Sequence, residues 1–193
     1  MLGFALHPGW VPDQGPTSWV YALYTVSPVP GQDMTYNEND QFSFSRLTRW
    51  KAKFDGGRIL VDLPTREVLL GQQNPDGTVP DGIASLHESH SNGSLIFGTD
   101  GSLLVCTGDG AHFDFNDTGG FDDPGFDDFV HPGTGLAGPT PKQEDSGAFR
   151  SQDLRSHAGK VLRIDPETGG GYPSNPFYDG DPFSPTSVSY THL

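Results

Sequence analysis

The stretch that decides the fold is His90-Ser-Asn-Gly-Ser-Leu-Ile-Phe-Gly-Thr-Asp-Gly-Ser-Leu-Leu-Val-Cys-Thr-Gly-Asp109. Two runs of β-prone apolar residues, at 95–97 and 103–106, flank the pair Asp100-Gly101. An Asp-Gly pair supplies the positive φ angles that a tight type I′ turn requires. The stretch therefore predicts a β-hairpin whose open end lies at its first and last residues.

The open end of this hairpin carries a histidine and an aspartate that can meet. With Asp-Gly at the centre of the turn, Leu95 is expected opposite Cys106. Asn92 is then opposite Asp109, and His90 lies diagonal to Asp109. Diagonal neighbours are roughly 7–8 Å apart at Cα, a gap that His and Asp side chains close when both point to one face. Because an Asp-held His is a common general base, His90 and Asp109 are the candidate catalytic residues; the alternative is that they only end and begin loops.

The rest of the chain predicts more short strands and no helix. Both hairpin strands are apolar at successive positions, which is typical of strands covered on both faces. Strands are predicted at residues 2–6, 19–26, 41–51, 59–63, 67–70 and 159–165, with a loop at 72–89. No segment has a sustained 3.6-residue apolar period with helix caps. The fold class is all-β; sandwich, barrel and propeller are all open, and repeated strand units favour a β-propeller.

The net charge and the number of cysteines exclude several classes of partner and site. The 193 residues carry a net charge of −14, which argues against a nucleic-acid partner because phosphates require a basic surface. Cys106 is the only cysteine, so a disulfide framework and a cysteine zinc site are excluded. Its place in an apolar strand predicts a buried, inert thiol. No apolar run approaches the length of a membrane-spanning helix.

Two stretches offer metal ligands without a recognisable site. Residues 110–150 are rich in Gly, Asp, Pro and Phe, and we interpret them as a long insertion without regular structure. This acidic insertion has oxygen ligands suited to Ca²⁺ but lacks EF-hand spacing, so a solvated loop is favoured. The candidate ligands are Asp114, Asn116, Asp117, Asp122, Asp123, Asp127 and Asp128. His87, Glu88 and His90 would scatter on a strand or loop and would need further ligands. No residue is therefore assigned to a metal.

Four segments together make the chain similar to the soluble quinoprotein glucose dehydrogenase and sorbosone dehydrogenase family. They are residues 1–8, residues 18–25 with 44–47, residues 90–109, and residues 159–165 running on to 175–177. The resemblance implies a six-bladed β-propeller, secreted or periplasmic, that oxidises sugars with pyrroloquinoline quinone (PQQ) held by Ca²⁺. It also implies two partners, a small sugar substrate and an electron acceptor.

The same resemblance gives the hairpin residues their roles. His90 falls where the family has its catalytic base, and Asp109 falls where it has the carboxylate that pairs with this base. His90 would take the proton of the sugar hydroxyl while hydride passes to the quinone. Ser89 stands where glucose-oxidising members have Asp, which leaves the preferred sugar open. The alternatives are a non-catalytic propeller that binds carbohydrate or protein, and a metal-dependent lactonase.

The resemblance also sets the expected domain boundaries. Residues 1–187 are expected to form roughly the first half of the propeller domain, with the insertion at about 110–150. The family's Ca²⁺ ligands and most of its cofactor contacts are expected beyond residue 193. Residues 188–193 are expected to be a non-native tail. The strand that the family would place after Pro185-Thr186 is missing from the sequence pattern, and these residues resemble translated sequencing-adapter read-through. An open half-propeller would expose unpaired blade surfaces.

Overall fold

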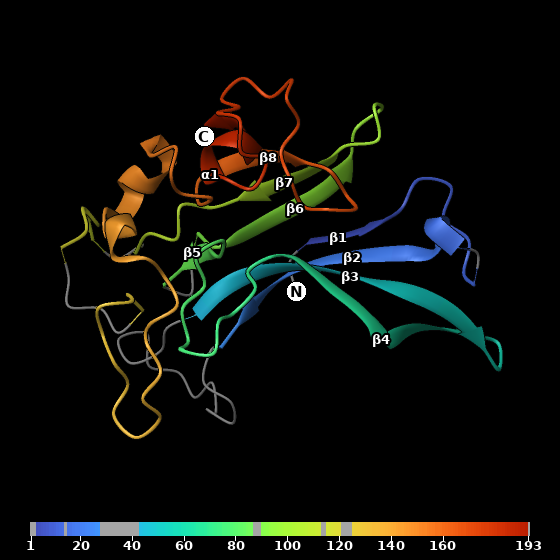
Figure 1. Cartoon of the computed structure of the whole chain (residues 1–193), viewed down its shortest axis with the longest axis horizontal. Helices are drawn as coiled ribbons and strands as arrows, with labels where there is room; N and C mark the ends of the chain where they lie inside the picture. The colour runs from blue at the N-terminus through green and yellow to red at the C-terminus, as the bar shows by residue number, and fades with distance from the viewer. Residues whose placement is uncertain are drawn as a thin grey trace.

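Two antiparallel β-sheets form the framework of the chain (Figure 1). The computed structural model describes residues 3–13, 15–27, 43–86, 90–112, 115–120 and 125–192. The first sheet has the order β1 (Gly3–Leu6), β2 (Trp19–Val26), β3 (Ser43–Asp55) and β4 (Arg58–Leu70), and the short β5 (Ile83–Ser85) pairs with β3. The second sheet has the order β6 (Asn92–Phe97), β7 (Leu103–Thr107), β8 (Lys160–Ile164) and β9 (Ser189–His192).

Helical structure is limited to single turns or little more in the described ranges. The 3₁₀ segments are η1 (Gly15–Ser18), η2 (Lys142–Glu144) and η3 (Gly147–Gln152), and the α-helix is α1 (Pro185–Val188). None of these helices is long and apolar enough to cross a membrane. The predicted all-β class is therefore confirmed.

The core lies where the two sheets meet, with β1 beside β6 (Figure 1). Gly3 permits this close approach, since a Cβ there would lie 3.1 Å from both the Gly93 carbonyl oxygen and the Leu95 side chain. The Tyr21 ring meets the Phe97 ring edge-on at 5.3 Å, which links the sheets. The fully buried apolar side chains come from both sheets: Tyr21, Leu23, Leu47, Ile83, Leu103, Val105, Leu162 and Ile164. Burial of each aliphatic side chain contributes roughly 1.5–3 kcal/mol.

The predicted hairpin is present, but its turn is longer than expected. The Gly98 N–H donates to the Ser102 carbonyl at 2.8 Å, and the Gly101 N–H donates to the Gly98 carbonyl at 3.1 Å. Gly101 has a φ of 83°. The loop therefore has three residues, 99–101, with glycine in the left-handed position that follows a type I turn. The predicted two-residue type I′ turn was wrong.

This longer loop shifts the register of the hairpin. Leu95 pairs with Val105, where the sequence predicted Cys106. An irregularity between Asn92 and Leu95 moves the register again, so that Asn92 pairs with Thr107. A one-residue change in turn length changes which residues face each other along the whole strand.

The hairpin strands bury one face and leave the other partly or largely exposed. Leu95 is buried against the first sheet, while its neighbour Ile96 is 60% exposed. Cys106 is half-buried, which corrects the predicted buried thiol. The expectation that both faces are covered does not hold within the described residues, because the outward face of β6 has no second layer over it.

β4 runs unbroken through Pro64, where the sequence predicted two strands. Proline cannot donate a backbone hydrogen bond to the sheet. The Thr65 hydroxyl oxygen instead accepts the Lys51 backbone N–H at 2.8 Å and donates to the Asp62 carbonyl at 2.6 Å. The pairing of β3 with β4 is irregular at this point, so proline produces a local bulge and leaves the strand continuous.

Two short strands of the structure were not predicted from the sequence. β5 lies inside the predicted loop, and β9 lies where a non-native tail without a strand was expected. β9 pairs with β8, with Val161 opposite Thr191. Both strands have only three or four residues and gain their backbone partners from distant parts of the chain, so local sequence gives little signal for them.

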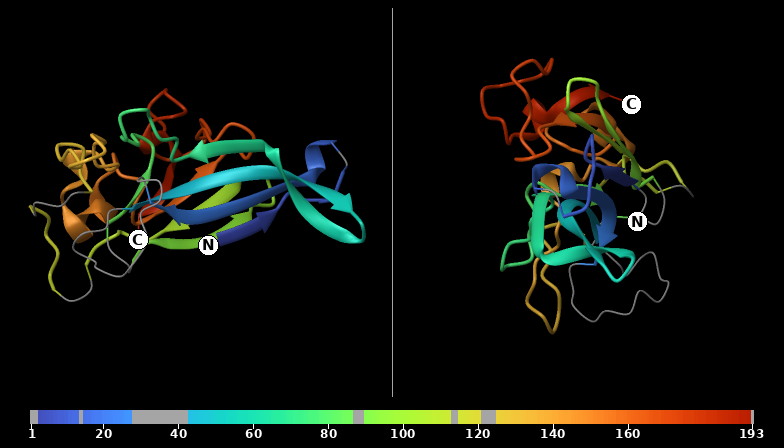
Figure 2. Two further views of the ribbon diagram at one scale, coloured as in Figure 1. Left: turned by 90° about the horizontal axis from the view of Figure 1, so that it is seen from below. Right: turned by 90° about the vertical axis from the view of Figure 1, so that its right-hand side faces the viewer.

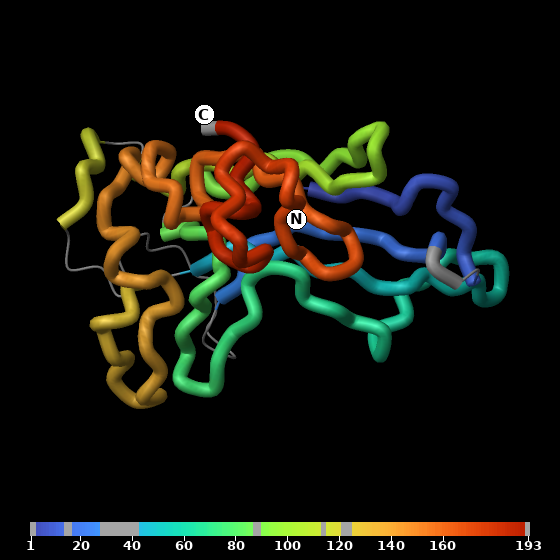
Figure 3. Tube along the Cα trace, turned by 45° about the horizontal axis from the view of Figure 1, so that its top comes forward, coloured from blue at the N-terminus to red at the C-terminus, as the bar shows by residue number. Residues whose placement is uncertain are grey.

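The described part of residues 110–150 contains 3₁₀ turns and isolated bridges, and no strand. Figures 2 and 3 show residues 125–152 at the end of the molecule opposite the β3–β4 arm. The hairpin's open end points toward this segment (Figure 1). The segment rejoins the second sheet at β8, which brings it back beside the last residues of β7.

Candidate active site

His90 and Asp109 meet at the open end of the β6–β7 hairpin. His90 Nδ1 lies 3.3 Å from Asp109 Oδ1. The His90 side chain is 53% exposed and that of Asp109 is 25% exposed, so the ring reaches solvent while the carboxylate is mostly covered. The structure thus brings together the two residues that the sequence singled out.

Glycines on either side of Asp109 allow this approach. The Gly108 N–H donates to the Ser91 carbonyl at 2.6 Å, and the Gly110 N–H donates to the His90 carbonyl at 2.8 Å. A Cβ at position 108 would collide with the His90 carbonyl oxygen. Only glycine therefore lets the two chain segments run this close, and the main chain itself sets the distance between the histidine and the aspartate.

The Asp109 carboxylate is oriented by its own loop. Asp109 Oδ1 accepts the backbone N–H of Ala111 at 3.0 Å. This short-range bond fixes the side-chain direction in the manner of an Asx turn. The same oxygen faces His90, so the bond that shapes the loop also aims the carboxylate at the ring.

His90 occupies an unusual backbone conformation. Its φ is 53°, in the left-handed region where non-glycine residues are uncommon. Such a conformation costs about 1 kcal/mol or more and persists where surrounding structure enforces it, often at functional sites. The ring is half exposed and its contact with Asp109 is partly solvated, so the contact itself contributes little stability in return. The geometry favours a functional role for His90.

The contact selects one form of the imidazole ring. An ionised carboxylate only accepts hydrogen bonds, so a neutral His90 facing Asp109 through Nδ1 carries its proton on Nδ1. Nε2 then holds a free lone pair. The arrangement can accept a proton at Nε2 and stabilise the resulting imidazolium, which is the action of an oriented general base.

A second polar contact anchors the strand that begins after His90. Asn92 Nδ2 donates to Thr25 Oγ1 at 3.2 Å, across the boundary between the two sheets. Thr25 lies near the end of β2, so the site end of the hairpin is tied to the first sheet. This link fixes β6 beside β2 within three residues of the candidate base.

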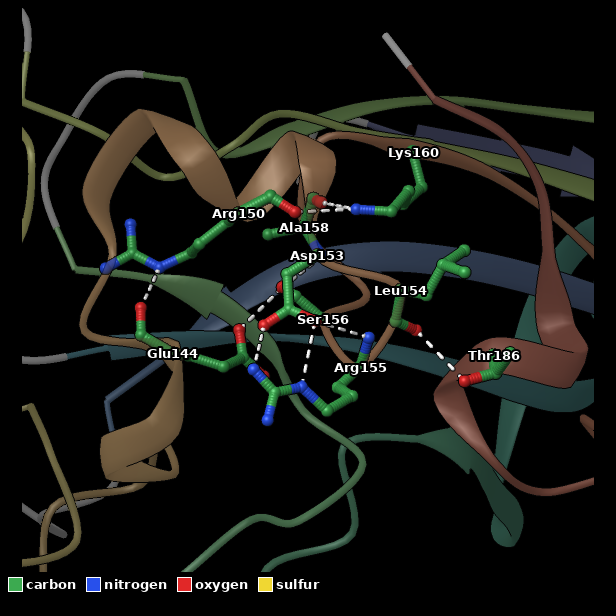
Figure 4. Close-up of polar contacts among 9 residues, drawn as sticks. All are labelled: Glu144, Arg150, Asp153, Leu154, Arg155, Ser156, Ala158, Lys160 and Thr186. Carbon is green, nitrogen blue, oxygen red and sulfur yellow. Dashed lines mark hydrogen bonds and ion pairs between the residues drawn. The ribbon is translucent and has the colours of Figure 1, made fainter.

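Figure 4 shows a buried polar network formed by residues between 144 and 160. Glu144, Arg150 and Lys160 are each at most 3% exposed. Ser156 Oγ donates to Glu144 Oε2 at 2.7 Å, and Lys160 Nζ donates to the carbonyls of Arg150 and Ala158 at 2.7 and 2.9 Å. The network reaches the site through Arg150 Nη1, which donates to the Asp109 carbonyl at 3.2 Å.

Burial shifts the pKa values of three groups in this region. Burial raises the pKa of Glu144 to about 7, against the opposing effects of the Ser156 hydroxyl and the Arg150 charge. Burial also lowers the pKa of His157 to about 4 and that of Lys160 to about 8. His157 is therefore neutral at pH 7, and Glu144 exchanges its proton in that range.

The described residues supply no metal site. Within them, no group of three or more His, Cys, Asp or Glu side chains gathers where one ion could bind. They consequently do not fit the Ca²⁺ that accompanies PQQ in the family the sequence resembles. His87, Glu88 and Ser89 lie outside the described residues, as do Asp114, Asp122 and Asp123 of the acidic insertion.

Sequence reasoning missed Arg150 and Lys160 as neighbours of the site. Arg150 is 41 residues from Asp109 and follows a stretch without regular structure. Lys160 begins a predicted strand, where a lysine ordinarily faces solvent. The one available signal was the scarcity of basic residues between positions 110 and 150, where Lys142 and Arg150 are the only two.

Comparisons with known proteins complete the description. No family model matches the chain, and no curated protein matches it. A solved structure described as a glucose dehydrogenase from Thermus thermophilus is 25% identical over 96% of this chain, with a TM-score of 0.48. Two others described as glucose dehydrogenases are 16% and 14% identical over 93% and 88% of this chain, with TM-scores of 0.48 and 0.44.

The chain covers 36%, 34% and 32% of those three structures, which is about a third of the length of each. Over nearly all of its own length, this chain is therefore similar to about a third of a glucose dehydrogenase structure.

Proposed function

We propose that the chain belongs to a sugar oxidoreductase that oxidises a CH–OH group of an aldose, with His90 as the general base and Asp109 as its orienting carboxylate. The sequence resemblance supports PQQ with Ca²⁺ as the hydride acceptor, an exported location, either secreted or periplasmic, and a separate electron acceptor. Because the described residues do not fit a Ca²⁺ site, only the proton transfer is assigned to side chains of this chain.

The proposed step begins with a substrate hydroxyl at His90 Nε2. Oxidation of the CH–OH group removes a hydride from carbon and a proton from oxygen. His90 accepts that proton, and Asp109 stabilises the imidazolium through the Nδ1 contact. A positioned base of this kind contributes about 10²–10⁴-fold to the rate.

The observation that carries the proposal is the 3.3 Å contact between His90 Nδ1 and Asp109 Oδ1, formed on a left-handed His90 backbone. If the contact had only a structural role, its stabilising free energy should offset the free-energy cost of the left-handed His90 backbone. A half-exposed polar contact of this kind contributes about 0–1 kcal/mol even when both groups are charged. Orientation of a base explains why a constrained backbone would hold a solvent-accessible ring.

The test is dye reduction by the intact protein supplied with PQQ, Ca²⁺ and a panel of aldoses. We expect His90→Ala to lower kcat by about 10²–10⁴-fold without loss of folded protein. His7→Ala is the matched control. The His7 ring packs against Phe97 at the opposite end of β6, so this variant should retain turnover.

Two results would overturn the proposal. One is unchanged turnover in His90→Ala. The other is an absence of dye reduction across the whole panel although PQQ binding is demonstrated. Sugar binding without PQQ affinity, retained in His90→Ala, would instead identify a non-catalytic carbohydrate-binding module.

A further inference from the structure

We propose that Arg150 is the positioning residue of the site: its guanidinium holds the Asp109 main chain so that the Asp109 carboxylate faces His90. The role in turnover rests on the proposed function, whereas the effect on the geometry of the pair does not. Arg150 is a buried charged residue that takes no direct part in the proposed proton transfer.

The contacts of Arg150 join two loops. The residue is 1% exposed. Its Nε donates to the Glu144 carbonyl at 2.7 Å, as Figure 4 shows, and its Nη1 donates to the Asp109 carbonyl at 3.2 Å. The planar guanidinium thus fixes the separation between these two carbonyls, because its donors have a rigid geometry.

Arg150 does not owe its place to an ion pair. In the part of the chain that the structure describes, the hydrogen bonds of its guanidinium go to the main-chain carbonyls of Glu144 and Asp109. Burial lowers the pKa of Arg150, and the charges of Glu144 and Asp117 oppose that effect from farther away. Burying a charge is costly unless hydrogen bonds compensate it. The bonds that compensate here end on main-chain carbonyls, one of which belongs to Asp109.

The main chain of Arg150 is itself anchored to the second sheet. Lys160 is fully buried at the start of β8 and donates through Nζ to the Arg150 carbonyl at 2.7 Å. The backbone N–H of Gly159 donates to the Gly108 carbonyl at 2.7 Å. The first residue of β8 therefore holds Arg150, and the residue just before β8 holds Gly108, the neighbour of Asp109.

Asp109 needs such an anchor because its neighbours are glycines. Gly108 and Gly110 are each held by a hydrogen bond from the backbone N–H to the segment at residues 90–91. Between them, the Asp109 carbonyl accepts its bond from Arg150. Without that bond, the peptide that joins Asp109 to Gly110 is held only by the Gly110 N–H bond to the His90 carbonyl, about which it can tilt and shift the Asp109 carboxylate from the ring. Misplacement of a catalytic group by about 1 Å can lower a rate about 10²-fold.

The test measures the tautomer of neutral His90 by NMR in protein labelled with ¹⁵N-histidine, with the His90 signals assigned from His90→Ala. In the unaltered protein we expect the proton on Nδ1, facing Asp109. Asp109→Asn, which keeps the carbonyl but removes the anionic acceptor, gives the reference for a ring released from its carboxylate.

We expect Arg150→Met to move His90 toward that reference and to lower kcat at least 10-fold with a smaller change in KM. Arg150→Lys keeps the charge but can reach only one carbonyl, so it should fall between the two. Arg155→Met is the matched control: this arginine is 68% exposed and pairs with Asp153 at the surface, so its loss should leave both readouts unchanged.

Each outcome decides the proposal. An unchanged His90 tautomer in Arg150→Met, with the native spectrum of the other histidines, would overturn it. If that variant does not fold, Arg150→Lys decides in the same way, because an unchanged tautomer there also overturns it. A shifted tautomer combined with full turnover in His90→Ala would leave the positioning role standing and reject the proposed function.

Discussion

Replacing Glu144 with glutamine should make the difference in stability between the variant and the unaltered protein depend on pH. Glu144 is 3% exposed, and its side chain accepts a hydrogen bond from Ser156 Oγ. The charged groups that act on it are Arg150, Asp153 and Lys160. Glutamine keeps the shape and an acceptor oxygen but does not titrate, so the comparison isolates the proton on this carboxyl group.

The direction of this pH dependence follows from the raised pKa of Glu144. Burial raises the pKa of Glu144 from 4.5 to about 7, so the folded state binds this proton more tightly than the unfolded state. The resulting stabilisation is fully present below pH 4.5 and is lost as the pH rises through 7. At about 1.4 kcal/mol per pH unit, the loss is about 3 kcal/mol. The opposite shift at His157 raises stability between about pH 4 and 6.5 in both proteins and cancels in the difference.

Urea unfolding of both proteins at intervals from pH 4 to pH 8.5 measures this difference from the midpoints and m-values. We expect the two proteins to have similar free energies of unfolding near pH 4.5, and Glu144→Gln to be more stable by about 3 kcal/mol above pH 8. A difference that stays within about 0.5 kcal/mol over the whole range would refute the reasoning, because it would mean that the Glu144 carboxylate reaches water.

Three further predictions concern the framework of the site. Thr107→Val should lower the free energy of unfolding by about 1–3 kcal/mol in urea titrations, because it leaves the His157 carbonyl and the Lys160 N–H without their buried hydroxyl partner; an unchanged midpoint would contradict this. Gly101→Ala should cost about 1 kcal/mol, since Gly101 has a φ of 83° and open space around it. Leu63 on the β3–β4 arm is 71% exposed, so Leu63→Thr should change the free energy of unfolding by no more than about 0.5 kcal/mol. The variant should also bind less of a hydrophobic fluorescent dye than the unaltered protein. A large loss of stability would show that the arm is covered.

Much of the fold could be predicted because its strongest signals are local. Runs of strand-forming residues predicted β2 and β8, and two apolar runs around Asp100-Gly101 predicted the β6–β7 hairpin. The hairpin register could not be predicted, because Asp-Gly fits both a two-residue turn and the last positions of the three-residue loop found here. The short strands β5 and β9 depend on partners far away in the sequence.

The candidate site was predicted in part, and the reason is geometric. Diagonal neighbours in a hairpin are close in several registers, so His90 and Asp109 still meet although the predicted turn was one residue too short. The left-handed backbone of His90 could not be read from the sequence, because nothing in its local pattern demands it. Arg150 was missed because a tertiary contact, across 41 residues, places it next to Asp109.

Chemical rescue tests most directly the claim that His90 is the base. Its ring is half exposed, so His90→Ala leaves a space that exogenous imidazole can enter from solvent. In the intact protein with PQQ, Ca²⁺ and an aldose, we expect added imidazole to restore dye reduction to His90→Ala in a saturable manner, and to leave the unaltered protein unchanged. Full turnover in His90→Ala without imidazole, or no recovery at any imidazole concentration in a folded variant that binds PQQ, would contradict the claim.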